Sequence, residues 1–513
     1  MSLFGLPILG LITFLPVAGV VLVACMPSSR PDLVRRAALG TALVVWVLSL
    51  LLLAAFASGQ AGFQYKEAFD WIPSFGIQYK VGVDGLSLLM VVLTTTLTWI
   101  SILASFGPIK DRVKGYMISF LVLEVGMIGV FVALDLFLFY IFWEIVLVPM
   151  YLIIGIWGGQ RRLYASLKFF IYTMLGSMPM LVAILYIGVR TGDPFGRPSF
   201  SYDWILAHAT FNGPTTLWLF AAFFVAFAVK VPIWPFHTWL PDAHVEAPTA
   251  GSVVLASIML KVGTFGFLRF AVPLFPGVAS YPPVRFAILT LAVIGIVYGA
   301  LVAMVQPDFK KLVAYSSVSH LGFVMLGIFA MTVQSVQGAL FVNLAHGVST
   351  GALFLLVGMM YERRHSRLLD DYGGIAKVMP VFATILTIVS FSSIGVPGTN
   401  GFVGEFLVLV GSFRTQPIFA LIASTAVIFA AAYLLWALQR IIYNPLTKPE
   451  NKILPDLNWR EIGLLLPLLF AIVWLGVYPA PVLDRTREAA ARFVHRVETS
   501  SLNLGLGPNV EIR

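Results

Sequence analysis

The chain is dominated by long apolar stretches that are separated by short polar segments. A helix needs about 20 apolar residues to cross the hydrocarbon core of a membrane. Fourteen stretches have this length, near residues 4–26, 38–57, 82–105, 114–133, 136–157, 167–189, 215–236, 251–272, 284–305, 309–330, 336–360, 378–411, 418–440 and 462–480. Strands of a membrane barrel alternate in polarity over about ten residues, whereas these stretches are apolar throughout. The sequence therefore predicts an all-α polytopic membrane protein with about 14 transmembrane helices.

The composition agrees with this interpretation. Only 11% of the 513 residues are Asp, Glu, Lys or Arg, whereas soluble domains carry about 25%. The single cysteine, Cys25, excludes a zinc or iron–sulfur site made of several thiolates. No loop is long enough for a soluble domain that could bind NADH, a flavin or a haem. We therefore expect no cofactor in this chain, and no nucleic-acid partner despite the net charge of +9.

Lysine and arginine are distributed unevenly between the two sides of the predicted membrane domain. Nineteen lie in one set of alternate loops, seven lie in the opposite loops, and five lie in the C-terminal tail. Positively charged loops of membrane proteins face the cytoplasm. The first set is therefore predicted to be cytoplasmic, which puts both termini on the far side of the membrane.

Two predicted spans, the seventh and the twelfth, contain helix-breaking residues at membrane depth. Pro232 and Pro235 interrupt the seventh, and Pro397 lies among three glycines in the twelfth. Proline removes a backbone donor and clashes with the preceding turn. Broken helices in matching places indicate a transporter built from repeats, although chance proline and glycine residues are the alternative. The two breaks are five spans apart, which is an odd number, so the second repeat is expected to be inverted relative to the first.

This pattern predicts a division of the chain into four parts. The expected parts are the N-terminal helices (1–110), a first five-helix repeat (111–275), a second, inverted five-helix repeat (276–440), and a final helix with the C-terminal tail (441–513).

Ionisable residues inside the predicted spans are candidate functional residues, because a charge at the centre of a membrane helix costs about 2.5–3.5 kcal/mol. Glu144 lies in the middle of span five without a neighbouring cation, and Lys230 lies at the break of span seven. We expect these two residues to pair. A pair that separates and re-forms can release and regain a proton, and a static ion pair is the alternative.

Further ionisable residues indicate a proton pathway. Lys261 lies in the middle of span eight, where a serine and a threonine share its helix face. His320 and His346 lie on spans ten and eleven, and Glu405 follows the break of span twelve. Histidine both donates and accepts near neutral pH, which suits a relay. The alternative for each histidine is a hydrogen-bonded structural role.

Two other polar features have simpler explanations. Asp135 is expected to cap span five as an N-terminal acceptor. Residues 237–246 contain enough histidine and carboxylate side chains for a metal site, but Pro241 interrupts a helical display of ligands. We expect a connecting segment there and no metal.

Several motifs resemble those of the antiporter-like membrane subunits of respiratory complex I. They lie at residues 237–249, 260–269, 308–317 and 343–346, and the resemblance covers residues 80–480. Phe265 stands where the family usually has tyrosine. Glu405 matches one branch of the family, whereas other branches tend to have lysine there.

The resemblance implies a proton-translocating subunit of a bacterial inner-membrane NADH:quinone oxidoreductase, with both termini periplasmic. Glu144 and Lys230 would be the coupling pair, Lys261 and His320 the central relay, and His346 would lead to Glu405 at the end. NADH, FMN, the iron–sulfur clusters and quinone would bind to other subunits. The expected partners are the other membrane subunits, including related antiporter-like ones, and the lipid bilayer. The alternative is a subunit of a multisubunit cation/proton antiporter, which would use the gradient itself.

Overall fold

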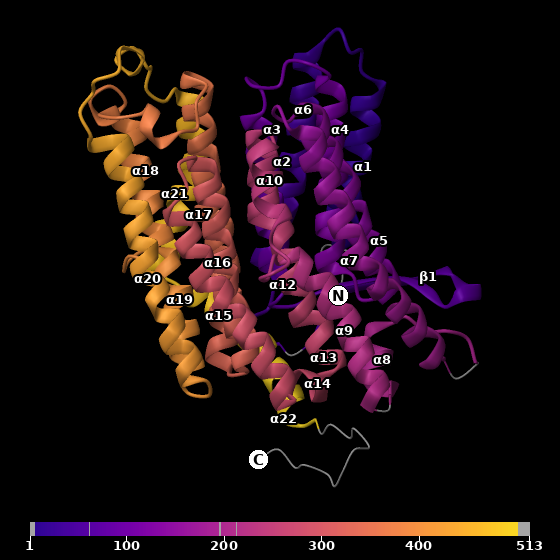
Figure 1. The fold of residues 1–513 in the computed structure, drawn as a ribbon. Helices are drawn as coiled ribbons and strands as arrows, with labels where there is room; N and C mark the ends of the chain where they lie inside the picture. The colour runs from indigo at the N-terminus through magenta and orange to yellow at the C-terminus, as the bar shows by residue number, and fades with distance from the viewer. Residues whose placement is uncertain (1–5, 61, 194–195, 212, 501–513) are drawn as a thin grey trace.

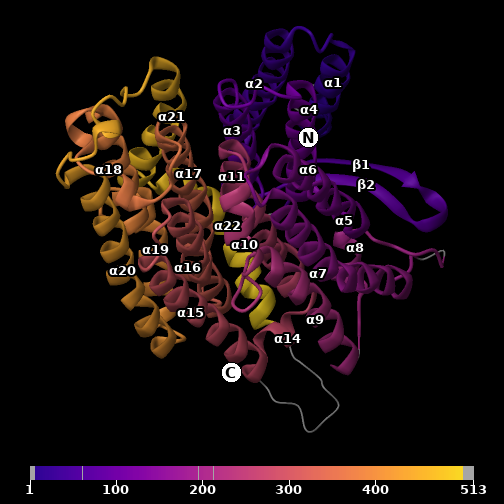
Figure 2. The ribbon, with the colours of Figure 1, turned by 45° about the horizontal axis from the view of Figure 1, so that its top comes forward.

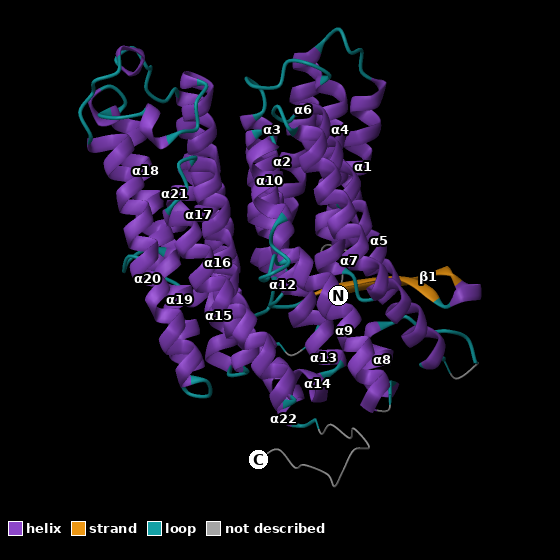
Figure 3. Cartoon of the chain, viewed as in Figure 1, coloured by secondary structure: helices purple, strands orange, loops and turns teal. Residues whose placement is uncertain are grey.

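The computed structural model describes residues 6–60, 62–193, 196–211 and 213–500, most of which are helical (Figure 3). The first half of the chain contains α1 (Ile8–Cys25), α2 (Pro31–Ala55), β1 (Gln64–Ile72), β2 (Ile77–Val83), α3 (Leu88–Ala104), α4 (Val113–Val132), α5 (Leu136–Ile145), α6 (Leu147–Trp157), α7 (Arg162–Arg190), α8 (Tyr202–His208), α9 (Gly213–Lys230), α10 (Trp239–Glu246), α11 (Thr249–Val254), α12 (Leu260–Gly266), α13 (Val272–Leu274) and α14 (Pro276–Ser280). The second half contains α15 (Pro282–Met304), α16 (Phe309–Ala330), α17 (Val333–Arg364), α18 (Pro380–Ile394), α19 (Asn400–Phe413), α20 (Pro417–Leu438), α21 (Trp459–Val477) and α22 (Ala480–Glu498).

Within the described residues, 12 helices are long and apolar enough to cross a membrane. One of them is the continuous helix Thr249–Leu274, in which the π-helical segments η2 (Leu255–Met259) and η3 (Phe267–Ala271) join α11, α12 and α13. Three apolar helices, α3, α18 and α19, are shorter. The chain is thus a multi-pass helical membrane protein, as the sequence predicts.

The helices form two groups that follow the order of the chain (Figure 1). The first half of the chain packs on one side and α15 to α21 pack on the other, while α22 contacts α17 of the second group and α13 and α14 of the first. The most buried spans are Thr249–Leu274, α16 and α17. In the outer helices α1, α2, α7, α20 and α21 fewer than half of the residues are buried within the chain, as in helices that face lipid or other membrane subunits.

One predicted span begins later than expected, because a β-hairpin precedes it. Span three was predicted to start at residue 82, but residues 77–83 form β2, which pairs antiparallel with β1 and projects from the helices (Figure 2). In β2 the side chains of Ile77, Tyr79 and Val81 are buried, whereas Gln78 and Lys80 are more exposed. This period of two is the pattern of a strand with one buried face.

Both predicted helix breaks are present. The helix of span seven ends at Lys230 and resumes as α10, and the helix of span twelve ends at Ile394 and resumes at Asn400. Residues 237–246 connect two spans, as expected, but residues 239–246 are helical, so Pro241 does not interrupt a helix there as the sequence suggested. Pro241 lies in the first turn of α10, where backbone N–H groups need no helical partner.

The predicted cap of span five is confirmed. The Oδ1 atom of Asp135 accepts hydrogen bonds from the backbone N–H groups of Phe137 and Leu138, each at 3.0 Å. Its carboxylate therefore fixes the start of α5, the helix that carries Glu144.

Candidate functional site

Lys261 lies in the fully buried helix Thr249–Leu274, two residues after the end of the π-helical segment η2. Its side chain is fully buried. The Nζ atom donates to the carbonyl oxygen of Ala256 in η2, at 2.5 Å, and lies 2.6 Å from Nδ1 of His346. Single π turns inside α-helices occur often at functional sites. Here the π turn supplies a carbonyl acceptor that orients the amine toward His346.

His346 and His320 continue the polar contacts from Lys261 to Glu405. The two imidazole rings lie 5.5 Å apart between centroids, and Nδ1 of His320 lies 2.7 Å from Oε1 of Glu405. The four side chains come from α12, α17, α16 and α19, and each is at most 8% exposed. Lys261, His346, His320 and Glu405 therefore form one buried line, which we call the central line.

The order of the histidines differs from the expected one. The resemblance implied that Lys261 and His320 form the central relay and that His346 leads to Glu405. In the structure His346 contacts Lys261 and His320 contacts Glu405. The reason is packing, because α17 lies against η2 with Gly347 close to the carbonyl of Ser257.

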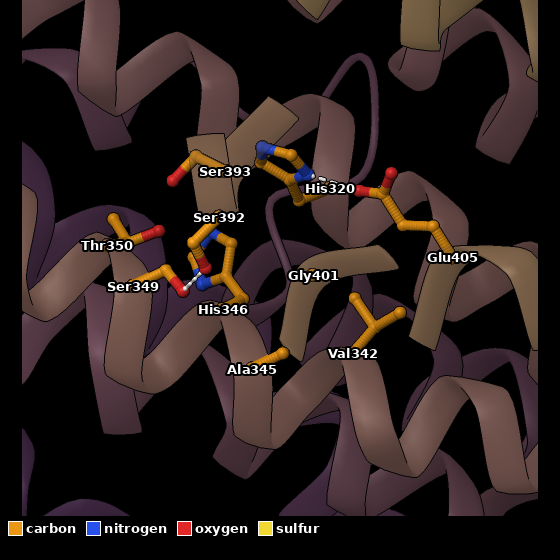
Figure 4. Close-up of a pocket in the computed structure, with 10 residues that line it drawn as sticks. All are labelled: His320, Val342, Ala345, His346, Ser349, Thr350, Ser392, Ser393, Gly401 and Glu405. Carbon is orange, nitrogen blue, oxygen red and sulfur yellow. Dashed lines mark hydrogen bonds and ion pairs between the residues drawn. The ribbon is translucent and has the colours of Figure 1, made fainter. Parts of the chain in front are cut away.

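A small cavity lies beside the two histidines and Glu405 (Figure 4). Its volume is about 20 Å³, which is enough for one water molecule. Its wall includes serines from α17 and α18: Ser349 and Ser392 are hydrogen-bonded to each other at 2.6 Å, and each hydroxyl also lies within hydrogen-bonding distance of Oδ1 of Asn400 at the helix break. The polar wall can therefore solvate a proton between the histidines and Glu405.

Several of these polar residues were not among the predicted site residues. Asn343 accepts a hydrogen bond from Thr264 at 3.0 Å, close to Lys261, and Asn400 begins α19. Both lie inside stretches that the sequence had singled out, the 343–346 motif and the 394–401 break, so their positions were a usable signal. Ser392 lies in an apolar helix and offers no such signal.

Glu144 and Lys230 lie at the other end of the site but do not touch. Oε1 of Glu144 accepts a hydrogen bond from Ser177 of α7 at 2.6 Å. The Lys230 ammonium lies over the rings of Trp143 and Phe169, 5.4 and 5.7 Å from their centroids. Among the described residues no ion pair forms between the two, although Glu144 lies within electrostatic range of Lys230. The side chain of Lys230 begins beside α12, since its Cβ is 3.1 Å from a Cβ built at Gly263.

A buried ion pair that the sequence did not predict lies at the start of α3. Asp84 and Arg269 are 2.5 Å apart, and Arg492 of α22 lies 3.7 Å from the other carboxylate oxygen. Burial alone would raise the pKa of Asp84, but the Arg269 guanidinium holds it below its ordinary value. Arg269 belongs to the same continuous helix as Lys261. The pair therefore fixes one end of that helix.

No group of three or more histidine, cysteine or carboxylate side chains among the described residues is arranged to hold a metal ion.

Sequence comparison identifies the family. A profile described as "NADH:quinone oxidoreductase/Mrp antiporter, TM" matches residues 133–430, more than half of the chain. The chain is 48% identical to NADH-quinone oxidoreductase subunit M of Rhodobacter capsulatus, over 97% of this chain and 98% of that protein. The chain belongs to this family. It is an antiporter-like membrane subunit of the complex I type.

Other members agree with this assignment. The chain is 43% identical to NADH-ubiquinone oxidoreductase chain 4 of Marchantia polymorpha, over 94% of this chain and 95% of that one. It also superposes on a chain of respiratory complex I from Thermus thermophilus with bound NADH, with a TM-score of 0.86, 32% identity, and coverage of 95% and 99% of the two chains. A chain of the Mrp complex from Dietzia is 20% identical with a TM-score of 0.79, over 98% of this chain and 53% of that one, and shares the fold.

Proposed function

We propose that this complex I subunit moves protons along the central line, driven by electron transfer in other subunits. The observation that carries the proposal is the buried line of Lys261, His346, His320 and Glu405, whose neighbours lie 2.6 and 2.7 Å apart at its two ends. Ionisable side chains are costly in a membrane and mark proton relays. Here four of them, taken from four different helices, lie in one buried line. Apolar side chains would pack these helices together equally well or better.

Each contact can carry a proton in a defined way. The ammonium of Lys261 donates to Nδ1 of a neutral His346, or the neutral amine accepts from it. Between His346 and His320 the rings are not hydrogen-bonded to each other, and the adjoining cavity of about 20 Å³ has room for one water to bridge them. His320 then exchanges its proton with Glu405.

We propose that Glu144 and Lys230 couple this line to the rest of the complex. Glu144 has a second partner in Ser177, so it has a place to rest when it is apart from Lys230. When Glu144 moves toward Lys230, the lysine is stabilised as a cation. When Glu144 returns to Ser177, the buried lysine loses its counter-charge and can release its proton toward the central line.

The architecture that we propose has fourteen spans. They are the twelve long helices, α3, and the pair α18–α19 counted as one broken span. Two inverted five-helix repeats, residues 111–275 and 276–440, would each contain one break, with residues 1–110 before them and 441–513 after them. The distribution of lysine and arginine supports an orientation with both termini in the periplasm, and the similarity to a bacterial subunit M supports a bacterial inner membrane.

The proposal assigns all redox chemistry to other subunits. Moving one proton against 100 mV costs about 2.3 kcal/mol, so a pump needs an energy source outside this chain. NADH, FMN, iron–sulfur clusters and quinone would act in the partner subunits.

The test is proton pumping by Glu144→Gln and Lys230→Ala variants of the complete complex in membrane vesicles. We expect NADH-driven pumping to fall sharply, while electron transfer to an artificial acceptor reports normal assembly. Glu450→Gln and Lys452→Ala change the same residue types at exposed positions and serve as matched controls. Normal pumping by both pathway variants would refute the coupling role.

A second measurement separates this function from cation/proton exchange. In liposomes without NADH, an antiporter subunit exchanges Na⁺ for H⁺ down the gradient. We expect no such exchange here, and its observation would favour the antiporter alternative.

A further inference from the structure

The residues that line the cavity beside the central line carry three buried polar atoms without a partner. They are Nε2 of His320, Nε2 of His346 and Oγ of Ser393, and none of them forms a hydrogen bond with any of the described residues. All three side chains belong to residues that are at most 8% exposed. A buried polar atom without a partner is unfavourable. These atoms therefore need a shared partner that can donate as well as accept.

Each histidine already uses its other ring nitrogen for the central line. Nδ1 of His346 lies 2.6 Å from Lys261, and Nδ1 of His320 lies 2.7 Å from Glu405. Figure 4 shows His320 with one ring nitrogen toward Glu405 and the other on the side where Ser393 lies. The step that remains open is therefore the one between the two Nε2 atoms. The ring centroids are 5.5 Å apart, and one water molecule can bridge polar atoms up to about 6 Å apart.

The Ser393 hydroxyl differs from the other serine hydroxyls near the line. Serines inside helices commonly donate to the backbone carbonyl one turn back, as Ser316 does to Val313 at 2.8 Å. Ser393 forms no such bond with the described residues, although it lies within α18. Ser349 and Ser392, the other serines of the cavity wall, are bonded to each other. Ser393 is therefore the wall serine whose hydroxyl is left to bind a further group.

We propose that Ser393 is the positioning residue for a water molecule that connects His346 to His320. This inference rests on the proposed function. The cavity of about 20 Å³ can hold one water, and a buried water typically forms about three hydrogen bonds. The two Nε2 atoms and the Ser393 oxygen supply these three partners. The water accepts from one histidine, donates to the other, and donates its second proton to Ser393.

The hydroxyl fixes the geometry of the transfer without taking the transported proton. The Nε2–H bond of His346 breaks, and its proton forms an O–H bond with the water. One O–H bond of the water breaks at the same time, and that proton forms an N–H bond with Nε2 of His320. The other proton of the water stays hydrogen-bonded to Ser393, which keeps its own proton. Ser393 thus determines how often the water is aligned with both rings.

The test compares Ser393→Thr with Ser393→Val in the complete complex in membrane vesicles. The two side chains have nearly the same shape, but only threonine has the hydroxyl. We expect the threonine variant to keep most of the NADH-driven pumping and the valine variant to pump about fivefold more slowly, the factor for one lost hydrogen bond. Electron transfer to an artificial acceptor reports assembly. If neither variant assembles, Ser393→Ala, which removes only the hydroxyl, replaces them with the same expected loss.

A spectroscopic measurement separates positioning from a structural role. In infrared difference spectra, exchange into heavy-oxygen water identifies the O–H stretching band of the bridging water by its isotope shift. We expect this band in the wild type and in Ser393→Thr, and a shifted or absent band in Ser393→Val. A serine that serves only packing would leave the band unchanged.

Ser390→Ala is the matched control on the same helix. Ser390 lies one turn before Ser393 in α18 and is 1% exposed. Its hydroxyl also has no partner among the described residues, but it is not part of the cavity wall. The control should change neither the pumping rate nor the water band.

The outcomes distinguish this inference from the proposed function. Equal pumping by Ser393→Thr and Ser393→Val, or a wild-type water band in Ser393→Val, would overturn the role of Ser393 and leave the proton pathway in place. Normal pumping by Glu405→Gln would show instead that the pathway itself is wrong.

Discussion

The helix break between α18 and α19 contains a glycine contact that tests whether the break positions Glu405. Gly401 lies in the first turn of α19, and a Cβ built there would lie 2.0 Å from the carbonyl oxygen of Ser392. Real Cβ atoms essentially never approach another heavy atom closer than 3.0 Å. A Gly401→Ala substitution must therefore push the start of α19 away from the end of α18 by about 1 Å.

The magnitude of the effect follows from this displacement. Overpacking of this kind costs roughly 1–3 kcal/mol, which a large helical bundle can absorb. Glu405 lies one helical turn after Gly401, and its contact with His320 is 2.7 Å long. A shift of about 1 Å stretches that contact beyond hydrogen-bonding distance, and misplacements of this size cost on the order of 100-fold in rate. We expect Gly401→Ala to assemble but to pump about 10- to 100-fold more slowly.

The assay is dye-reported proton uptake by inverted membrane vesicles during NADH oxidation, normalised to electron transfer to an artificial acceptor. Gly463→Ala is the matched control, because a Cβ at this exposed position of α21 meets no heavy atom within 4 Å. Alanine favours a helix over glycine, so the control should pump normally. Equal pumping by Gly401→Ala and Gly463→Ala would refute the role of the break.

The remaining predictions concern stability outside the central line. Arg269→Leu leaves the buried carboxylate of Asp84 without its main partner and should lower the free energy of unfolding by about 3–5 kcal/mol. The thermal midpoint of the purified complex should fall accordingly. Adding Asp84→Asn to the same chain should recover part of this stability. Glu67 accepts hydrogen bonds from the first N–H groups of α1 at 2.9 and 3.0 Å, so Glu67→Ala should cost about 1 kcal/mol and increase proteolysis near α1. Burial alone would raise the pKa of Asp203, but Lys80 and Lys66 hold this pKa below its ordinary value. The contacts with the two lysines therefore stabilise the fold above about pH 4, and this stabilisation is lost as the pH falls further. Hydrogen exchange in the β-hairpin should increase only below about pH 4.

The parts of the fold that could be predicted are those that depend on local chemistry. Proline and glycine act on their own turn of helix, so the breaks at Pro235 and Pro397 were visible in the sequence. An ionisable residue in an apolar helix is equally visible, which identified Lys261 and Glu405. The β-hairpin was also visible in principle, since residues 77–83 alternate, but the search for long apolar runs extended span three across its end.

The contacts between these residues could not be predicted, because they depend on packing between distant helices. Asp84 and Arg269 are 185 positions apart, and no local pattern relates them. The order of His346 and His320 depends on which face of α17 meets η2. The partner of Glu144 was expected to be Lys230, whereas the hydroxyl of Ser177 is the nearer group, and serine in a membrane helix is too common to stand out.

The two π-helical segments on either side of Lys261 have a mechanical consequence. Each wide turn accommodates one residue more than a regular turn. The extra residue of a π turn can move to another position along the helix. The residues that it passes then turn about the helix axis by one residue, about 100°, while the two ends of the helix stay in place. The amine of Lys261 can thus change its azimuth, and with it its neighbours, while Arg269 stays fixed to Asp84.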